Sequence, residues 1–129
     1  MNKRPIMRVG DLQLRILRLL WAEADLTVRD VHGRLGGESK WAYTTIATML
    51  KKMEARKLVS HRLADRKFVY KASVSETEVA QKMTTHLIER VFEGSLADMV
   101  SHLLQTREVS REELEELEKL IAQRKSKGR

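Results

Sequence analysis

The chain has 129 residues, no cysteine, 42% hydrophobic residues, 33% charged residues and a formal net charge of +7. This apolar content is enough for a folded core, while the lack of cysteine excludes disulfides and thiolate metal sites. No apolar run approaches the roughly 20 residues that span a bilayer, and the basic segment Met1–Gly10 lacks the apolar stretch of a signal peptide, so we expect a cytoplasmic protein without a membrane partner.

Three helices are predicted in the first part of the chain. Asp11–Ala24 has apolar residues at three- and four-residue spacing, and Asp11 is its N-cap or lies in its first turn. Thr27 opens the second helix, with an acid three residues later, and Gly36–Gly37 ends it. Tyr43–Arg56 is the third helix, with a buried apolar stripe on one side and threonines and lysines on the other.

A hairpin is predicted next, because the hydrophobic period changes and β-branched and aromatic residues become frequent. Val59–Arg62 and Phe68–Lys71 are its two strands, and the polar, basic segment Leu63–Lys67 joins them. The joining segment lacks the Asn-Gly or Asp-Gly pair that favours a tight turn.

Three more helices are predicted at residues 76–92, 96–106 and 111–124. Each follows a serine, Ser75, Ser95 or Ser110, with an acidic residue three positions later, which is a helix-start signal. The basic tail Lys125–Arg129 is expected to fray.

The charge is divided unevenly along the chain. Residues 1–73 carry 16 Lys and Arg against 7 Asp and Glu, a net charge of +9, whereas residues 74–129 carry 9 against 11, a net charge of −2. This division favours a first domain (residues 1–73) that meets a polyanion and a second (residues 74–129) that does something else.

Three helices followed by a hairpin are the element order of a winged helix-turn-helix, in a mainly α-helical chain. In that fold the third helix enters the major groove of double-stranded DNA and the hairpin lies beside the backbone. The candidate DNA-binding residues precede or lie on the third helix and on the hairpin: Lys40, Thr44, Thr45, Thr48, Lys51, Lys52, Arg62, Arg66 and Lys67. A helix face of threonine and lysine is equally typical of a merely solvated helix. The following hairpin and the uneven charge are what favour a DNA-binding function.

The sequence also resembles the penicillinase-repressor (BlaI/MecI) family. The resemblance extends from about residue 8 to 123, and it is carried by Gly10–Gln13, Leu20–Trp21, Thr27–His32, Trp41–Leu50, Phe68–Tyr70 and Ser101–Leu104. It implies a dimeric bacterial transcriptional repressor that binds a palindromic operator. On the family pattern, the DNA-facing positions of the third helix are Tyr43, Thr44, Thr45, Ala47 and Thr48.

The last three helices are predicted to form a homodimer. Their apolar residues are too many for a 55-residue appendage to bury alone, and a two-fold interface between copies solves that problem. The alternative is that these helices pack back onto the winged domain. The candidate dimerisation residues are Val79, Met83, Leu87, Val91, Leu96, Met99, Val100, Leu103, Leu104, Leu114, Leu117 and Ile121.

The resemblance further implies a possible regulatory protease. Antibiotic-responsive members of the family are cut at an Asn-Phe bond in the dimerisation region, and the matching residues here are His102 and Leu103. Copper-responsive relatives bind metal through C-terminal cysteines, which this chain lacks. We expect no cofactor, no metal and no catalytic residue, since the four histidines are scattered over different elements.

Two other functions remain open from the residues alone. A winged fold that binds another protein would not distinguish an operator from random DNA. A non-specific DNA-organising protein would bind tightly at low salt without sequence preference.

Overall fold

The computed structural model describes residues 9–128, so residues 1–8 and 129, with most of the basic N-terminal segment, lie outside the described residues. The chain divides into two compact units, residues 1–86 and residues 87–129. This division lies within a helix, whereas the sequence placed the domain boundary after residue 73. The functional division at residue 73 stays a prediction.

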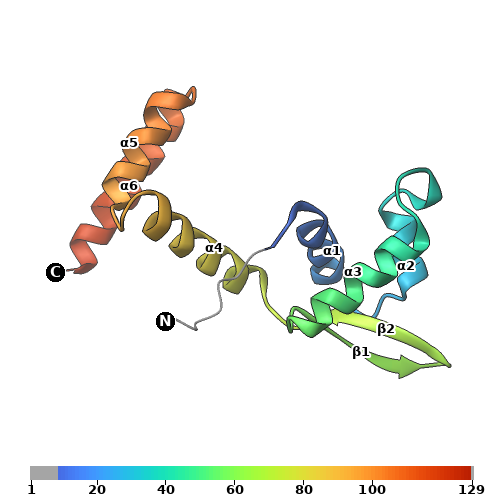
Figure 1. Ribbon diagram of the computed structural model, residues 1–129. Coiled ribbons are helices and arrows are strands. Elements are labelled where there is room, and N and C mark those ends of the chain that lie inside the picture. The colour runs from blue at the N-terminus through green and yellow to red at the C-terminus, as the bar shows by residue number, and fades with distance from the viewer. Residues whose placement is uncertain (1–8, 129) are drawn as a thin grey trace. The chain divides into compact units, whose positions relative to one another are not determined.

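The first unit is the predicted winged helix-turn-helix (Figure 1). Its helices are α1 (Asp11–Ala22), α2 (Val28–Arg34) and α3 (Tyr43–Ala55), followed by the strands β1 (Val59–Ala64) and β2 (Lys67–Ala72). A short 3-10 helix, η1 (Gly37–Ser39), was not predicted and lies between α2 and α3.

Local chemistry explains where the first helices begin and end. Gly10, not Asp11, is the N-cap of α1, and Asp11 lies in the first turn, where its carboxylate favours the helix dipole. Thr27 caps α2 as predicted, because its hydroxyl accepts a hydrogen bond from the backbone N–H of Asp30, whose carboxylate accepts one in return. Gly36, at φ +111°, follows the end of α2 in a backbone conformation that glycine adopts most easily.

The hairpin is longer and its turn is tighter than predicted. The strands pair antiparallel from Val59↔Ala72 to Ala64↔Lys67, which leaves only Asp65 and Arg66 in the turn. Both turn residues have positive φ, +50° and +67°, as the twist of a two-residue hairpin requires. The sequence missed this turn because arginine is not a residue that normally marks it.

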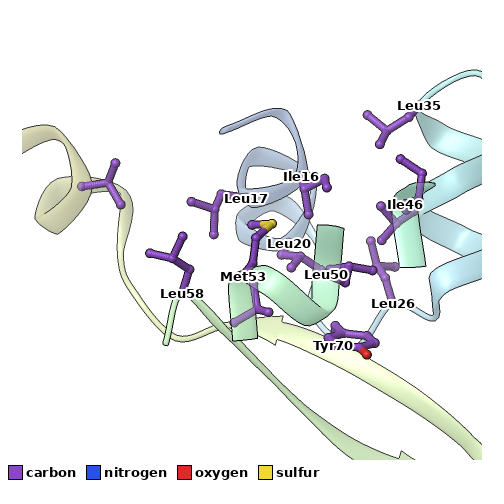
Figure 2. Packing of buried hydrophobic residues seen from close by; sticks show 13 residues of the cluster. Ile16, Leu17, Leu20, Leu26, Leu35, Ile46, Leu50, Met53, Leu58 and Tyr70 are labelled. Atoms are coloured by element: carbon purple, nitrogen blue, oxygen red, sulfur yellow. The ribbon is translucent and has the colours of Figure 1, made fainter. Parts of the chain in front are cut away.

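One hydrophobic cluster holds the first unit together. Ile16 and Leu17 from α1 meet Ile46, Leu50 and Met53 from α3, and all five side chains are fully buried. Figure 2 shows these side chains converging from the two helices, with Tyr70 of β2 beside them. The rest of the cluster is Leu20, Leu26, Val31, Leu35, Leu58, Val59 and Val79.

The helix α4 (Glu76–Val91) begins on this core. The indole Nε1 of Trp21 donates a hydrogen bond of 2.8 Å to the carbonyl oxygen of Val74, just before the helix. Val79 is 2% exposed and Met83 packs against the same cluster. The sequence assigned both to the dimer surface. For Val79 this assignment is wrong, because its side chain is buried in the core of the first unit, whereas for half-buried Met83 it stays a prediction.

The second unit contains the end of α4, α5 (Leu96–Thr106) and α6 (Arg111–Gly128). The three predicted serine caps are present, since the hydroxyls of Ser75, Ser95 and Ser110 each accept a hydrogen bond of 3.0 Å from a backbone N–H three residues later. The helix α6 extends beyond the predicted end at residue 124 and includes residues 125–128 of the basic tail, while Arg129 lies outside the described residues. Lysines in its last turn favour the negative end of the helix dipole.

Candidate nucleic-acid interface

The start of α3 is fixed by an acidic side chain from η1. Ala42, the N-cap residue, has no capping side chain, and the backbone N–H of Tyr43 donates instead to Oε2 of Glu38 at 3.1 Å. Nε2 of His32 lies 2.8 Å from the carbonyl oxygen of Trp41, which can only accept, so Nε2 carries the proton. These contacts fix where α3 leaves the preceding loop.

The outward face of α3 carries most of the residues that the sequence assigned to DNA binding. Ile46, Leu50 and Met53 face the core at spacings of four and three residues. The opposite side therefore presents residues at the same spacing, with Thr44, Thr48 and Lys51 along its centre. The predicted DNA-binding residues of this region that are exposed are Lys40, Tyr43, Thr44, Thr45, Thr48, Lys51 and Lys52.

Two residues lie at the edge of this face rather than on it. The ring of Tyr43 meets the buried ring of His32 edge-on, with centroids 5.5 Å apart, and the side chain is 43% exposed. Ala47 is half-buried. The centre of the face therefore consists of short hydroxyls followed by lysines.

The wing, residues 59–72, adds the second group of basic side chains. Arg62, Arg66 and Lys67 are all exposed, as a DNA-backbone contact needs. The guanidinium of Arg62 donates a hydrogen bond of 2.8 Å to Oδ2 of Asp25, a contact that sequence reasoning missed. Burial, followed by the charge of Glu54, raises the pKa of Tyr70, so the ring at the base of the wing stays neutral.

The acidic side chains of the first 73 residues are largely engaged within the chain. Five of the seven bind named partners: Glu23 with Arg34, Asp25 with Arg62, Asp30 with Thr27, Glu38 with Tyr43, and Glu54 with His61. Among residues 9–128, no ion pair involves Lys51 or Lys52. The positive charge of α3 is therefore available to an external anion, and phosphates are the anions that a helix with this face meets on DNA.

The second unit presents apolar side chains instead. No residue of α5 or of the described part of α6 is fully buried, although both helices carry regularly spaced apolar residues. The predicted dimerisation residues that are at least 38% exposed are Leu87, Val91, Leu96, Leu103, Leu104, Leu114 and Ile121. Met99, Val100 and Leu117 are half-buried.

The bond between His102 and Leu103 lies inside α5. The hydroxyl of Thr106 donates to the carbonyl oxygen of His102 at 2.8 Å, and the backbone N–H of Arg107 donates to that of Leu103 at 3.2 Å. A protease needs an extended segment, so this bond becomes accessible only where the helix opens.

Over residues 9–128, no helix has the length and apolar content to cross a membrane. Within the same range, no three His, Cys, Asp or Glu side chains are grouped as metal ligands.

The sequence is similar to known transcriptional repressors over nearly its whole length. Residues 9–123 match the family described as penicillinase repressor. The chain is 25% identical over 124 residues to the penicillinase repressor of Bacillus licheniformis, a match that covers 96% of this chain and 97% of that protein. It is 29% identical over 120 residues to the transcriptional regulator BlaI of Mycobacterium tuberculosis, covering 92% of this chain and 86% of that protein.

A solved structure resembles the first unit. It is the solution structure of the DNA-binding domain of the repressor BlaI, with 25% sequence identity and a TM-score of 0.50. The similarity covers 58% of this chain and 92% of that one.

Proposed function

The chain belongs to the penicillinase repressor family, and from this premise we propose that it is a homodimeric transcriptional repressor of a palindromic operator. The recognition helix is α3 and the wing is the β1–β2 hairpin. The observation that carries the proposal is the outward face of α3, where exposed threonines precede lysines that have no acidic partner among the described residues.

The division of work on this surface follows from side-chain chemistry. The hydroxyls of Thr44 and Thr48 are suited to base edges and thymine methyl groups, which specify a sequence. Lys51 and Lys52, with Arg66 and Lys67 on the wing, are suited to phosphates, which supply affinity to any sequence. Because α3 presents no arginine at its centre, base recognition relies on short side chains.

The proposal of a dimer rests on the apolar side chains of the second unit. Val91, Leu96 and Ile121 are 63%, 59% and 58% exposed, and each would lose solvent contact in an interface. A two-fold pair of copies covers the same surface on both protomers and gives each half of a palindrome one winged domain. The half-sites are then expected to lie about one helical turn of DNA, or a multiple of it, apart.

Regulation and target genes are further parts of the proposal. The names of relatives, which include a methicillin resistance regulatory protein of Staphylococcus aureus, support control of genes of the beta-lactam-resistance type. A regulatory protease that cuts at His102–Leu103 stays a prediction, and it requires α5 to open. We infer a cytoplasmic location, because the operator lies there, and we propose no cofactor and no catalytic activity.

The test is a fluorescence-anisotropy titration of the full chain at near-physiological salt. The probe duplex is the inverted repeat upstream of the protein's own gene, and the control duplex has the same bases shuffled. We expect at least about a thousandfold preference for the operator, with two protomers bound per duplex. Equal, salt-sensitive affinity for both duplexes would instead indicate a DNA-organising protein, and no binding to either would indicate a protein-interaction module.

A further inference from the structure

Two neighbouring residues of β1 connect the wing to the rest of the first unit. Nδ1 of His61 lies 2.7 and 2.9 Å from the two carboxylate oxygens of Glu54, on α3. The guanidinium of Arg62 lies 2.8 Å from the carboxylate of Asp25, in the turn between α1 and α2. Since successive strand residues point to opposite faces, one acidic side chain holds each face of the hairpin.

The packing of the wing explains why these contacts matter. At its base, the backbone of Tyr70 exchanges two hydrogen bonds, of 3.1 and 2.7 Å, with Leu26. Toward its tip, Leu63 and Phe68 form a cross-strand pair and remain 65% and 54% exposed. Val69, next along β2, is buried, whereas no side chain of residues 63–68 is. The tip of the wing therefore has no core contact of its own to fix its direction.

The ring of His61 is also held in one orientation. Its centroid lies 4.6 Å from that of Phe68 and 5.5 Å from that of Tyr70, its partner across the hairpin. Asp25 has φ +64°, a left-handed conformation that aspartate tolerates better than most residues. Both contacts thus depend on side chains whose direction is set by neighbouring structure.

The charge of these carboxylates makes their position unexpected. Glu54 and Asp25 border a surface that is otherwise suited to phosphates, and a carboxylate there repels a phosphate. Ion pairs between half-exposed side chains also contribute little to folding stability. Neither DNA affinity nor stability explains the two carboxylates, whereas a fixed wing does.

We propose that Glu54 and Asp25 are positioning residues, which act through His61 and Arg62 to hold the wing at a fixed direction relative to α3. The basic turn at Arg66 then reaches the backbone in register with the contacts of Thr44 and Thr48, so that the two carboxylates increase operator discrimination. This inference rests on the proposed function.

The test combines two substitutions at each position. Glu54→Ala removes the contact to His61, whereas Glu54→Gln keeps an acceptor oxygen. Asp25→Gly removes the contact to Arg62 without backbone strain, since glycine suits its positive φ, and Asp25→Asn keeps an acceptor. The matched control is Glu23→Gln, which removes a carboxylate whose ion pair with Arg34, at 3.1 Å, does not involve the wing.

We expect Glu54→Ala and Asp25→Gly each to weaken operator binding about 5- to 10-fold, while binding to the shuffled duplex stays equal or tightens. Glu54→Gln and Asp25→Asn should bind the operator with nearly wild-type affinity. Glu23→Gln should leave the ratio of the two dissociation constants unchanged. If Glu54→Ala and Asp25→Gly leave that ratio unchanged, or tighten both complexes equally, the carboxylates act only as repelling charges and the inference is wrong.

A second measurement needs no DNA and separates this inference from the proposed function. In the DNA-free protein, the ¹H–¹⁵N heteronuclear NOE of the amides of Asp65 and Arg66 reports the order of the wing tip. We expect it to fall in Glu54→Ala and Asp25→Gly and not in Glu23→Gln. An unchanged NOE overturns the inference. If the wild-type chain fails to prefer its operator, the proposed function fails, and the NOE still decides whether the carboxylates position the wing.

Discussion

Replacing Thr48 by alanine tests the division of work on α3 most directly. Thr48 is exposed at the centre of the outward face, and the core residues of the helix lie on the opposite side. Alanine has a higher helix propensity than threonine, so the variant should be at least as stable as the wild-type protein. A loss of binding then reports a lost contact and not a lost fold.

The size of the effect follows from the two protomers on one operator. A neutral hydrogen bond contributes about 0.5–1.5 kcal/mol, so its loss in both half-sites costs about 1–3 kcal/mol. This corresponds to operator binding that is roughly 5- to 150-fold weaker. Binding to shuffled DNA should change little, because a base contact is not made there.

Lys51→Ala should weaken binding to both duplexes and reduce its dependence on salt. The slope of log K against log salt concentration is negative. Each lost phosphate contact reduces its magnitude by about 0.9, which is about 1.8 for two protomers. Both duplexes should weaken together, since phosphates carry no sequence information.

The assay is anisotropy titration of both duplexes over a series of salt concentrations. Thr84→Ala in α4 and Lys119→Ala in α6 are the matched controls, because both residues are exposed and lie on other helices. Equal weakening of operator and shuffled DNA by Thr48→Ala would contradict a base contact at Thr48, and an unchanged salt slope in Lys51→Ala would contradict a phosphate contact at Lys51.

Three further predictions concern stability and assembly. Leu50→Ala, at a fully buried position, should lower the free energy of unfolding by about 2–5 kcal/mol in denaturant titrations; a loss well below that range would mean that the core closes around the cavity. Ile121→Lys should convert the dimer into a monomer in sedimentation velocity, whereas Gln123→Lys on the same helix should not; a stable Ile121→Lys dimer would place the interface elsewhere. The hydrogen bond from the backbone of Thr27 lowers the pKa of Asp30 below its ordinary 3.8, so ionised Asp30 stabilises the fold above about pH 4 and the contribution is lost as the pH falls through the lowered pKa. The stability difference between wild type and Asp30→Asn should therefore shrink between about pH 5 and pH 2, and a difference that stays constant would contradict the assignment.

Membership in a repressor family and the geometry of α3 support each other from independent directions. The family match extends over residues 9–123 and thus includes both units. The geometry concerns only which side chains α3 exposes and which charges remain without partners. Neither depends on the other.

Most of the helical structure could be predicted because its signals are local. The spacing of Ile46, Leu50 and Met53 sets the buried side of α3 within a few residues of chain. Ser95 and Ser110 mark helix starts through hydrogen bonds to residues three positions away. Such interactions do not depend on how the helices pack against one another, so the apolar spacing and the helix caps can be predicted from the sequence alone.

The wing was predicted less well, because its turn and its partners depend on contacts that are not local in the sequence. Its strands were expected from their composition, but the two-residue turn at Asp65–Arg66 lacks the Asn-Gly or Asp-Gly pair that indicates such a turn. The partners of the wing are separated along the chain by 7 residues for His61 and Glu54 and by 37 for Arg62 and Asp25. No local pattern identifies such partners.

The sequence by itself determined the order of helices and strands, the outward face of α3, the serine caps and the uneven charge, because each depends on nearest neighbours or on composition. Only the tertiary structure decided that Val79 and Met83 cover the winged core, that Glu38 caps α3, and that Glu54 and Asp25 hold the wing. Val79, Met83 and Asp25 meet their partners because segments far apart in the sequence pack on one hydrophobic cluster. Glu38 and Glu54 lie 5 and 7 residues from their partners, a spacing outside that of a helix-capping box.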